Sequence, residues 1–223
     1  MSKQSAIIVP EGCSKVLLHA CCAPCSSAIV EWLMAHGIEP VIFYFNPNIY
    51  PLKEYEIRKN ESKRHAESLG ITWIDADEGL PVTGYGEAHN AWREAVCGLE
   101  NEPERGKRCE ACFYHRLLAT ARKAQELNIP FFATTLASSR WKNLDQINAA
   151  GKAAELPGVQ FWDQNWRKDG LQERRNELLK EYGFYNQLYC GCEFSMARNM
   201  GSIDGASPTA CTIHSFGVNL PKR

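Results

Sequence analysis

Seven of the ten cysteines in this chain of 223 residues fall into three short clusters that lie far apart in the sequence. The clusters are Cys21-Cys22-Ala23-Pro24-Cys25, Cys109-Glu110-Ala111-Cys112 and Cys190-Gly191-Cys192. Thiolates are soft metal ligands and redox groups, so this pattern indicates an iron–sulfur centre, a zinc site or a dithiol–disulfide couple. The fold must therefore bring three distant segments to one place.

The composition is that of an ordinary globular protein. Hydrophobic residues make up 44% of the chain, enough to bury a core without disulfide staples. The net charge of −1 gives no overall basic field, so contact with nucleic acid would need a local patch. The apolar stretch Ala6-Ile7-Ile8-Val9, broken at Pro10, is too short for a signal peptide or a membrane span. We therefore expect a cytoplasmic protein with no membrane partner, where clustered cysteines are typical of metal binding or catalysis.

Short apolar segments alternate with amphipathic ones along the chain. Strands are predicted over 16–20, 41–45, 71–75, 131–136 and 159–162. Helices are predicted over 26–34, 53–69, 91–99, 109–127, 145–155 and 171–182, with a loop over 76–88. The alternation predicts an α/β fold, a three-layer sandwich with a mainly parallel sheet. We expect residues 1–200 to form a single catalytic domain and 201–223 to form a C-terminal tail.

The first cluster follows a predicted strand directly and leads into a helix. Parallel α/β sheets place their functional sites at the carboxyl ends of the strands. Many such folds have a glycine-rich phosphate loop at this turn, whereas this chain has thiols, and the helix N-terminus there favours thiolates. The neighbouring Cys21 and Cys22 can both ligate a metal cluster. The alternative is that they are buried structural cysteines.

The second cluster is a C-x-x-C motif that opens a predicted helix. A polar loop precedes it, whereas a thioredoxin-like motif would follow a strand. Two thiolates from this turn and two from the first cluster make a four-cysteine set, which suits a 4Fe–4S cluster or zinc. The zinc alternative would make the chain a zinc-binding RNA-interaction module without redox activity.

The third cluster places Cys190 and Cys192 on either side of a glycine. Two cysteines so close can form a compact, strained disulfide that is easily reduced, with Gly191 supplying the backbone freedom. The alternative is that both ligate a second metal ion, together with Cys25. Tyr189 offers a hydroxyl group beside the two sulfurs.

Weaker signals suggest contact with a nucleic acid. A local phosphate-binding rim is predicted from basic residues: Arg105, Lys107, Arg108, Arg116, Arg140, Lys142, Arg174 and Arg175. Stacking faces for a base are offered by Tyr44, Phe45, Tyr50 and Trp141, although aromatic residues near strand ends more often belong to the core. No role is assigned to the isolated Cys13, Cys97 and Cys211.

Three motifs in this order resemble the cobalamin-independent epoxyqueuosine reductase family. They are His19-Ala20-Cys21-Cys22-Ala23-Pro24-Cys25, the Arg108-Cys109-x-x-Cys112-Phe113 stretch, and Tyr189-Cys190-Gly191-Cys192 with Ser195. The resemblance covers roughly residues 14–198. It implies a fold similar to the adenine-nucleotide alpha-hydrolase (HUP-like) type, in agreement with the strand–helix alternation.

The resemblance also implies an oxidoreductase that acts on tRNA. The reaction would be the two-electron deoxygenation of epoxyqueuosine to queuosine at the wobble position of the anticodon. Its partners would be the anticodon stem-loop and an electron donor that the sequence does not identify.

Site roles follow from the same resemblance. A 4Fe–4S cluster would be ligated by Cys21, Cys22, Cys109 and Cys112. Cys25 would ligate an additional iron ion. Cys190 and Cys192 would form a redox-active disulfide. The reaction also needs an acid, and our own hypothesis is that the nearby Tyr189 protonates the departing oxygen.

Overall fold

The protein is described by a computed structural model over residues 7–76 and 84–199. Its centre is a five-stranded sheet in the order β3-β2-β1-β4-β5, in which all neighbouring strands are parallel. The strands are β1 (Lys15–His19), β2 (Glu39–Tyr44), β3 (Trp73–Asp75), β4 (Phe131–Thr134) and β5 (Gln160–Phe161). The predicted parallel sheet is confirmed.

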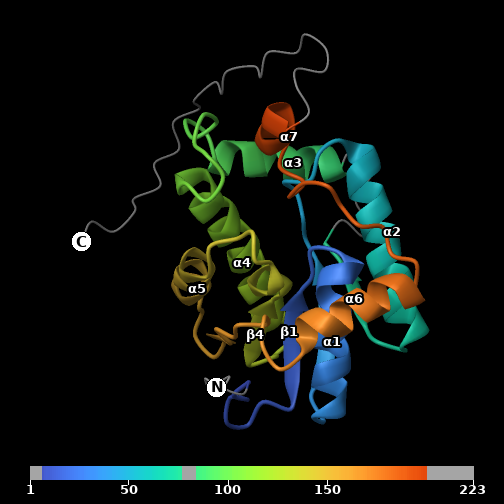
Figure 1. Cartoon of the computed structure of the whole chain (residues 1–223). Coiled ribbons are helices and arrows are strands. Elements are labelled where there is room, and N and C mark those ends of the chain that lie inside the picture. Colours follow the sequence, from blue (N-terminus) through green and yellow to red (C-terminus); the bar gives the residue numbers. More distant parts are fainter. Residues whose placement is uncertain (1–6, 77–83, 200–223) are drawn as a thin grey trace, which may run out of the picture.

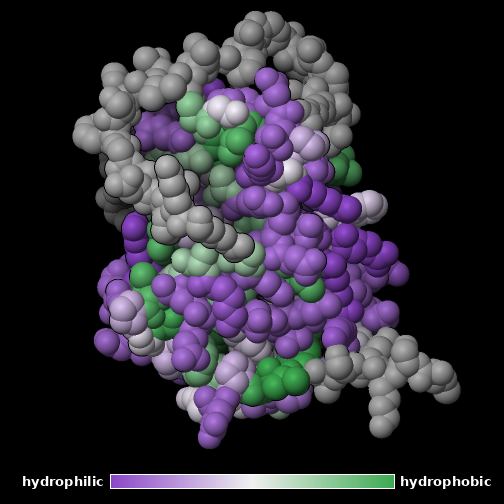
Figure 2. Space-filling model, turned by 90° about the vertical axis from the view of Figure 1, so that its left-hand side faces the viewer, coloured by the Kyte–Doolittle hydropathy of each residue, from purple (hydrophilic) through white to green (hydrophobic). Residues whose placement is uncertain are grey.

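Helices cover both faces of the sheet (Figure 1). One face carries α1 (Ala23–Ala35), α2 (Leu52–Ser68) and α6 (Leu171–Glu181). The other face carries α4 (Lys107–Glu126) and α5 (Leu144–Ala153), and hydrophilic side chains dominate its outer surface (Figure 2). The predicted three-layer α/β sandwich is therefore confirmed.

The core lies around the central strand and the helices packed on it. In β1, Val16, Leu17 and Leu18 are all fully buried, as expected for a central strand of a parallel sheet with helices on both sides. Helix α5 packs directly on β5, because a Cβ atom at Gly151 would lie only 2.4 Å from the ring of Phe161. The sequence therefore requires glycine where this helix meets the sheet.

Two short helices lie beyond the carboxyl ends of the strands, α3 (Gly84–Ala95) and α7 (Glu193–Asn199). The predicted loop over 76–88 is wrong from Gly84 onward, and its residues 77–83 lie outside the described residues. Helix α7 was not predicted. The two helices are held by a small second core, in which Trp92 and Val96 pack with Cys192 and Phe194. This stabilisation comes from tertiary contacts, which periodicity within one segment does not reveal.

Strand β4 ends two residues earlier than predicted. The side chain of Thr134 accepts a hydrogen bond from the backbone N–H of Leu136, and this caps a short 3-10 helix, η1 (Thr135–Ser138). This turn places Thr135 beside the first cysteine cluster, where the backbone N–H of Cys21 donates to its hydroxyl at 3.1 Å. The carboxyl ends of β1 and β4 therefore meet at one point.

That meeting point is the switch point of the sheet, because the chain continues to opposite faces from the two neighbouring strands. Sheets of this kind bind their ligands in the crevice outside the carboxyl ends of such strands. The predicted tail 201–223 lies outside the described residues, so the division into domain and tail stays a prediction. Among the residues the structure describes, no helix has both the length and the apolar character to cross a bilayer.

A cysteine-lined candidate active site

The first cluster forms a compact group of three sulfurs. The Sγ atoms of Cys21, Cys22 and Cys25 all lie within 4.8 Å of one another, and those of Cys21 and Cys22 are 3.8 Å apart. Cys22 is the N-cap of α1 in an extended conformation, and Pro24 occupies the first turn, where its missing N–H costs nothing. The structure thus places Cys25 with the two predicted cluster ligands, in a triad that can bind a metal ion.

The three thiols of the triad differ in acidity. Hydrogen bonds with Cys22 and Cys25 hold the pKa of the Cys21 thiol well below its usual range, and Thr135 donates to the same sulfur at 3.4 Å. The hydrogen bond to Cys21 raises the pKa of Cys22, and it raises that of Cys25 to about 12. Cys21 is therefore the first to ionise, and the thiolate is the form that binds soft metal ions.

Two buried arginines lie close to the thiols. Arg116, from α4, is 3% exposed and donates to Asn46 Oδ1 at 2.5 Å, and its charge helps to lower the pKa of Cys21. Arg58, from α2, pairs with Glu54 at 2.6 Å. A buried cation is costly unless negative charge compensates it; Glu54 does this for Arg58, and an ionised Cys21 would do it for Arg116.

Arg58 also fixes the third cluster. Its guanidinium donates to the backbone carbonyls of Tyr189 at 3.1 Å and Cys190 at 3.3 Å. Between the two cysteines, Gly191 has a φ of +98°, and a Cβ atom there would lie 2.9 Å from Ile49 and 3.0 Å from Arg58. Only glycine fits this backbone and this close approach. The loop is therefore tightly positioned against α2.

The structure does not support the predicted disulfide between Cys190 and Cys192, since the two cysteines are not bonded to each other in it. The backbone N–H of Cys192 donates to the sulfur of Cys190 at 3.4 Å, and the Cys190 thiol lies 3.7 Å from the hydroxyl of Ser195. These contacts satisfy the sulfur of Cys190 without the strained ring that a bridge across one residue would form. The pair is held as two thiols.

As in the triad, the two thiols of this pair differ in their pKa values. The hydrogen bond from Cys192, with help from the nearby Lys142, holds the pKa of Cys190 well below its usual range. The same hydrogen bond, together with burial, raises the pKa of Cys192. Cys190 is therefore a second thiolate.

All three clusters meet at one cavity of about 660 Å³. Its lining includes six of the seven clustered cysteines: Cys21, Cys25, Cys109, Cys112, Cys190 and Cys192. The seventh, Cys22, is in contact with Cys21. On the α4 side, Cys109 accepts a hydrogen bond from the backbone N–H of Arg105 at 3.3 Å, and burial raises its pKa. The fold thus brings the three distant clusters to one place.

Known proteins that are similar to this chain belong to the family indicated by the three cysteine clusters. The family model described as epoxyqueuosine reductase QueH matches residues 16–198. The chain belongs to this family. The resemblance predicted from the three cysteine motifs, over roughly 14–198, is confirmed, and so is the oxidoreductase class. The zinc-binding alternative is not favoured.

Relatives that carry this family's name cover most of the chain. The epoxyqueuosine reductase QueH of Histophilus somni is 47% identical over 190 residues, which are 84% of this chain and 74% of the relative. The protein of the same name from Haemophilus influenzae is 46% identical over equal shares. The one from Thermotoga maritima is 36% identical over 186 residues, 81% of this chain and 90% of the relative.

Tyr189, which we expected to act as an acid beside the third cluster, lines the cavity. Its hydroxyl donates to the backbone carbonyl of Tyr50, and its ring lies 5.4 Å from the guanidinium of Arg58. Burial, followed by the charge of Glu54, raises its pKa to about 12. The phenol therefore keeps its proton and directs it toward a carbonyl, so its role as the acid stays a prediction.

The sequence did not predict that Lys142 lies at the same cavity as the cysteines. It was expected only on a phosphate-binding rim, but it lines the same cavity as the cysteines. Burial acts to lower its pKa, yet the charges of Cys190 and Cys21 outweigh this effect and raise it. Lys142 thus places an ammonium group close to both thiolates.

The predicted phosphate-binding rim is partly wrong. Arg108 is 1% exposed, and it donates to the carbonyls of Leu99, Glu100 and Glu102. Arg116 is buried as described above, and Arg174 is paired with acidic neighbours, Glu31, Glu177 and Glu181. Among the predicted residues, the cavity is also lined by Arg105, Arg140 and Arg175.

Other predicted residues belong to the core. His19 is fully buried between Thr134 at 2.8 Å and the carbonyl of Phe45 at 3.1 Å, and burial lowers its pKa to about 3. Tyr44 is fully buried, whereas Trp141 is 75% exposed at the cavity. Of the aromatic residues considered for base stacking, Trp141 is therefore the most exposed.

Proposed function

We propose that this protein reduces epoxyqueuosine to queuosine at the wobble position of tRNA anticodons. The observation that carries the proposal is the single cavity at which all three cysteine clusters meet, in a chain of the epoxyqueuosine reductase family. The substrate would present its modified nucleoside to this cavity from the anticodon stem-loop.

The donor set of the cavity suits iron and sulfide. Its ligands are thiols, which select iron–sulfur clusters over hard cations. Arg58, Arg116 and Lys142 supply positive charge that would balance an anionic cluster. A 4Fe–4S cluster would be held by Cys21, Cys22, Cys109 and Cys112. An additional iron ion would be held by Cys25, Cys190 and Cys192, since the last two are free thiols rather than a disulfide.

When bound, such a group supplies single electrons and a Lewis acid for the epoxide oxygen. Removing that oxygen breaks two C–O bonds, forms a C=C bond and releases water. The balance requires two electrons from an external reductant and two protons. The chain must therefore supply at least one group that moves a proton to the departing oxygen.

Lys142 is placed for that step. Lys142 lines the cavity, and the charges of Cys190 and Cys21 act on its ammonium group, so an epoxide bound among the cysteines would have this cation in its surroundings. A proton given from its Nζ atom to the epoxide oxygen would neutralise the charge that develops as a C–O bond breaks. Tyr189, whose hydroxyl is bound to a carbonyl, is the competing donor.

Replacing Lys142 with Gln is expected to lower kcat by about 10²- to 10⁴-fold, the usual contribution of a positioned acid. The visible spectrum of the bound iron should persist, because Lys142 is not a ligand. Tyr189→Phe, which removes only a hydroxyl, should lower kcat far less. Single-turnover rates and iron content measured on both variants check this expectation. If Lys142→Gln keeps the wild-type rate and Tyr189→Phe loses most of it, Tyr189 is the acid rather than Lys142.

The proposed function itself is tested on protein purified without oxygen. Brown protein containing iron and labile sulfide, incubated with dithionite and an anticodon stem-loop that carries epoxyqueuosine, should yield queuosine. Mass spectrometry of the nucleosides detects the loss of one oxygen atom. Colourless protein with stoichiometric zinc and no turnover would refute the proposal and favour the zinc-binding module.

A further inference from the structure

One short loop at the mouth of the cavity carries three consecutive residues of a kind that binds RNA. Residues 139–143 connect η1 to α5, and Arg140, Trp141 and Lys142 all line the cysteine cavity. Trp141 is 75% exposed, whereas Tyr50 and Tyr114, the other exposed aromatic residues described, are 39% exposed. An indole face is thus open to solvent at the entrance to the site.

Two arginine side chains donate hydrogen bonds to the backbone carbonyls of this loop. Arg167 donates to the carbonyl of Ser139 at 2.5 Å and to that of Lys142 at 2.9 Å. Arg105 donates to the carbonyl of Trp141 at 2.8 Å. An exposed aromatic side chain on a fixed backbone loses little conformational entropy when a partner stacks on it. The loop therefore has the properties of a preorganised stacking platform.

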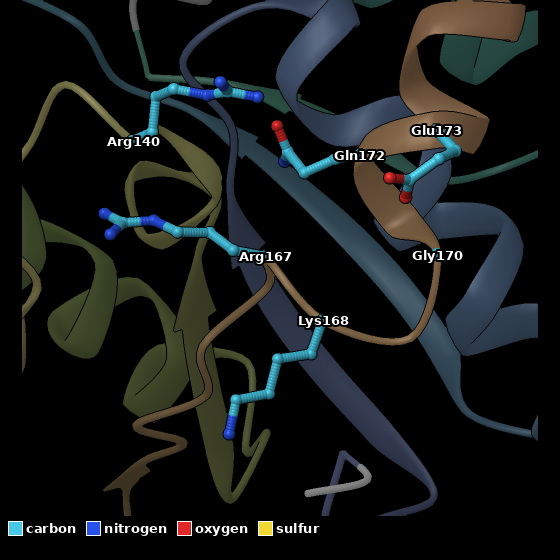
Figure 3. A pocket seen from close by; sticks show the side chains of 6 residues that line it. All are labelled: Arg140, Arg167, Lys168, Gly170, Gln172 and Glu173. Atoms are coloured by element: carbon cyan, nitrogen blue, oxygen red, sulfur yellow. The ribbon is translucent and has the colours of Figure 1, made fainter. Parts of the chain in front are cut away.

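A second, smaller cavity of about 300 Å³ lies next to this loop. It shares Arg140 and Gln172 with the cysteine cavity, so the two are adjoining. In Figure 3 the guanidinium of Arg140 and the amide of Gln172 point toward one another, while Arg167 and Lys168 extend away from them. Arg140 is thus the cation at the junction of the two cavities, and its planar guanidinium matches a phosphate group.

We propose that this loop binds the nucleotide next to epoxyqueuosine in the anticodon. Trp141 stacks on the neighbouring base, and Arg140 binds the phosphate between the two nucleotides. The inference rests on the proposed function, which places the modified nucleoside among the cysteines. Single-stranded RNA loops are recognised in this way, by stacking of splayed bases on aromatic residues and by charge at the phosphates.

Stacking is tested by combining a protein change with an RNA change. Trp141→Ala should weaken binding of an anticodon stem-loop to the iron-loaded protein by about 5- to 150-fold, while Trp141→Phe should keep most of the affinity. With a stem-loop that lacks the base beside the wobble position, Trp141→Ala should cause no further loss. Ile8→Ala, which removes a side chain of equal exposure far from the cavity, should leave affinity unchanged.

The phosphate contact is tested by salt dependence. Arg140→Gln should weaken binding and should make its dependence on salt shallower by about the contribution of one phosphate. The control is Arg122→Gln, which makes the same chemical change at an exposed residue of α4, about 20 Å along the helix from Cys109. The control should alter neither the affinity nor the slope.

The outcomes separate the inference from the proposed function. If wild-type protein yields queuosine but Trp141→Ala binds the stem-loop as tightly as wild type, the stacking site is refuted and the function stands. A loss that is equal for the complete and the base-deficient stem-loop also refutes stacking. If wild-type protein binds no stem-loop even at low salt, the RNA substrate itself fails, and the inference fails with it.

Discussion

Replacing Cys21 or Cys109 with Ser is expected to remove most of the bound iron and to abolish turnover. The two residues come from different segments, one after β1 and one from the first turn of α4, yet both line the same cavity. Serine is a harder and poorer ligand for iron–sulfur centres. If a single cluster bridges the two segments, losing either ligand should cause the same defect.

Iron and labile sulfide per chain, the visible absorbance of protein purified without oxygen, and nucleoside analysis measure this defect. The matched control is Cys97→Ser, since Cys97 is half-buried and does not line the cavity. A loss of iron in Cys21→Ser with full iron and full turnover in Cys109→Ser would contradict a shared cluster. It would confine the metal to the triad of Cys21, Cys22 and Cys25.

The sequence predicted the centre of the sheet well because its central strands contain continuous apolar runs. In β1, three consecutive apolar residues are fully buried, a pattern that is typical of a parallel strand covered by helices on both faces. The placement of the first cluster followed from this, since it comes directly after that strand. In contrast, α7 has seven residues and depends on the packing of Phe194 against Trp92, a contact between segments about 100 residues apart.

The individual roles of charged residues were harder to predict. Arg108 and Arg140 look alike in the sequence and both line the cysteine cavity, but Arg108 is buried and donates to backbone carbonyls, whereas Arg140 also lines the second cavity. Only tertiary structure separates them, because a guanidinium can serve a buried loop as well as a phosphate. The same holds for the third cluster. The spacing of its cysteines permitted a disulfide, whereas the contacts of Cys190 with Cys192 and Ser195 hold free thiols.

Those free thiols lead to the second large effect, which concerns Cys190 and Cys192. Changing either to Ser is expected to lower bound iron by about one ion per chain and to abolish turnover, while the 4Fe–4S absorbance persists. The reason is that the proposed ligands of the cluster lie elsewhere, whereas the additional iron depends on this pair and on Cys25. Cys25→Ser should therefore have the same effect.

A bound metal ion would keep both sulfurs ionised, so either variant should release the additional iron more readily than wild-type protein when titrated with a chelator. Iron counts on protein kept strictly without oxygen decide the matter. Unchanged iron with lost turnover in both variants would refute ligation and would leave the pair an electron-transfer role, whereas unchanged iron with full turnover would remove these thiols from the mechanism.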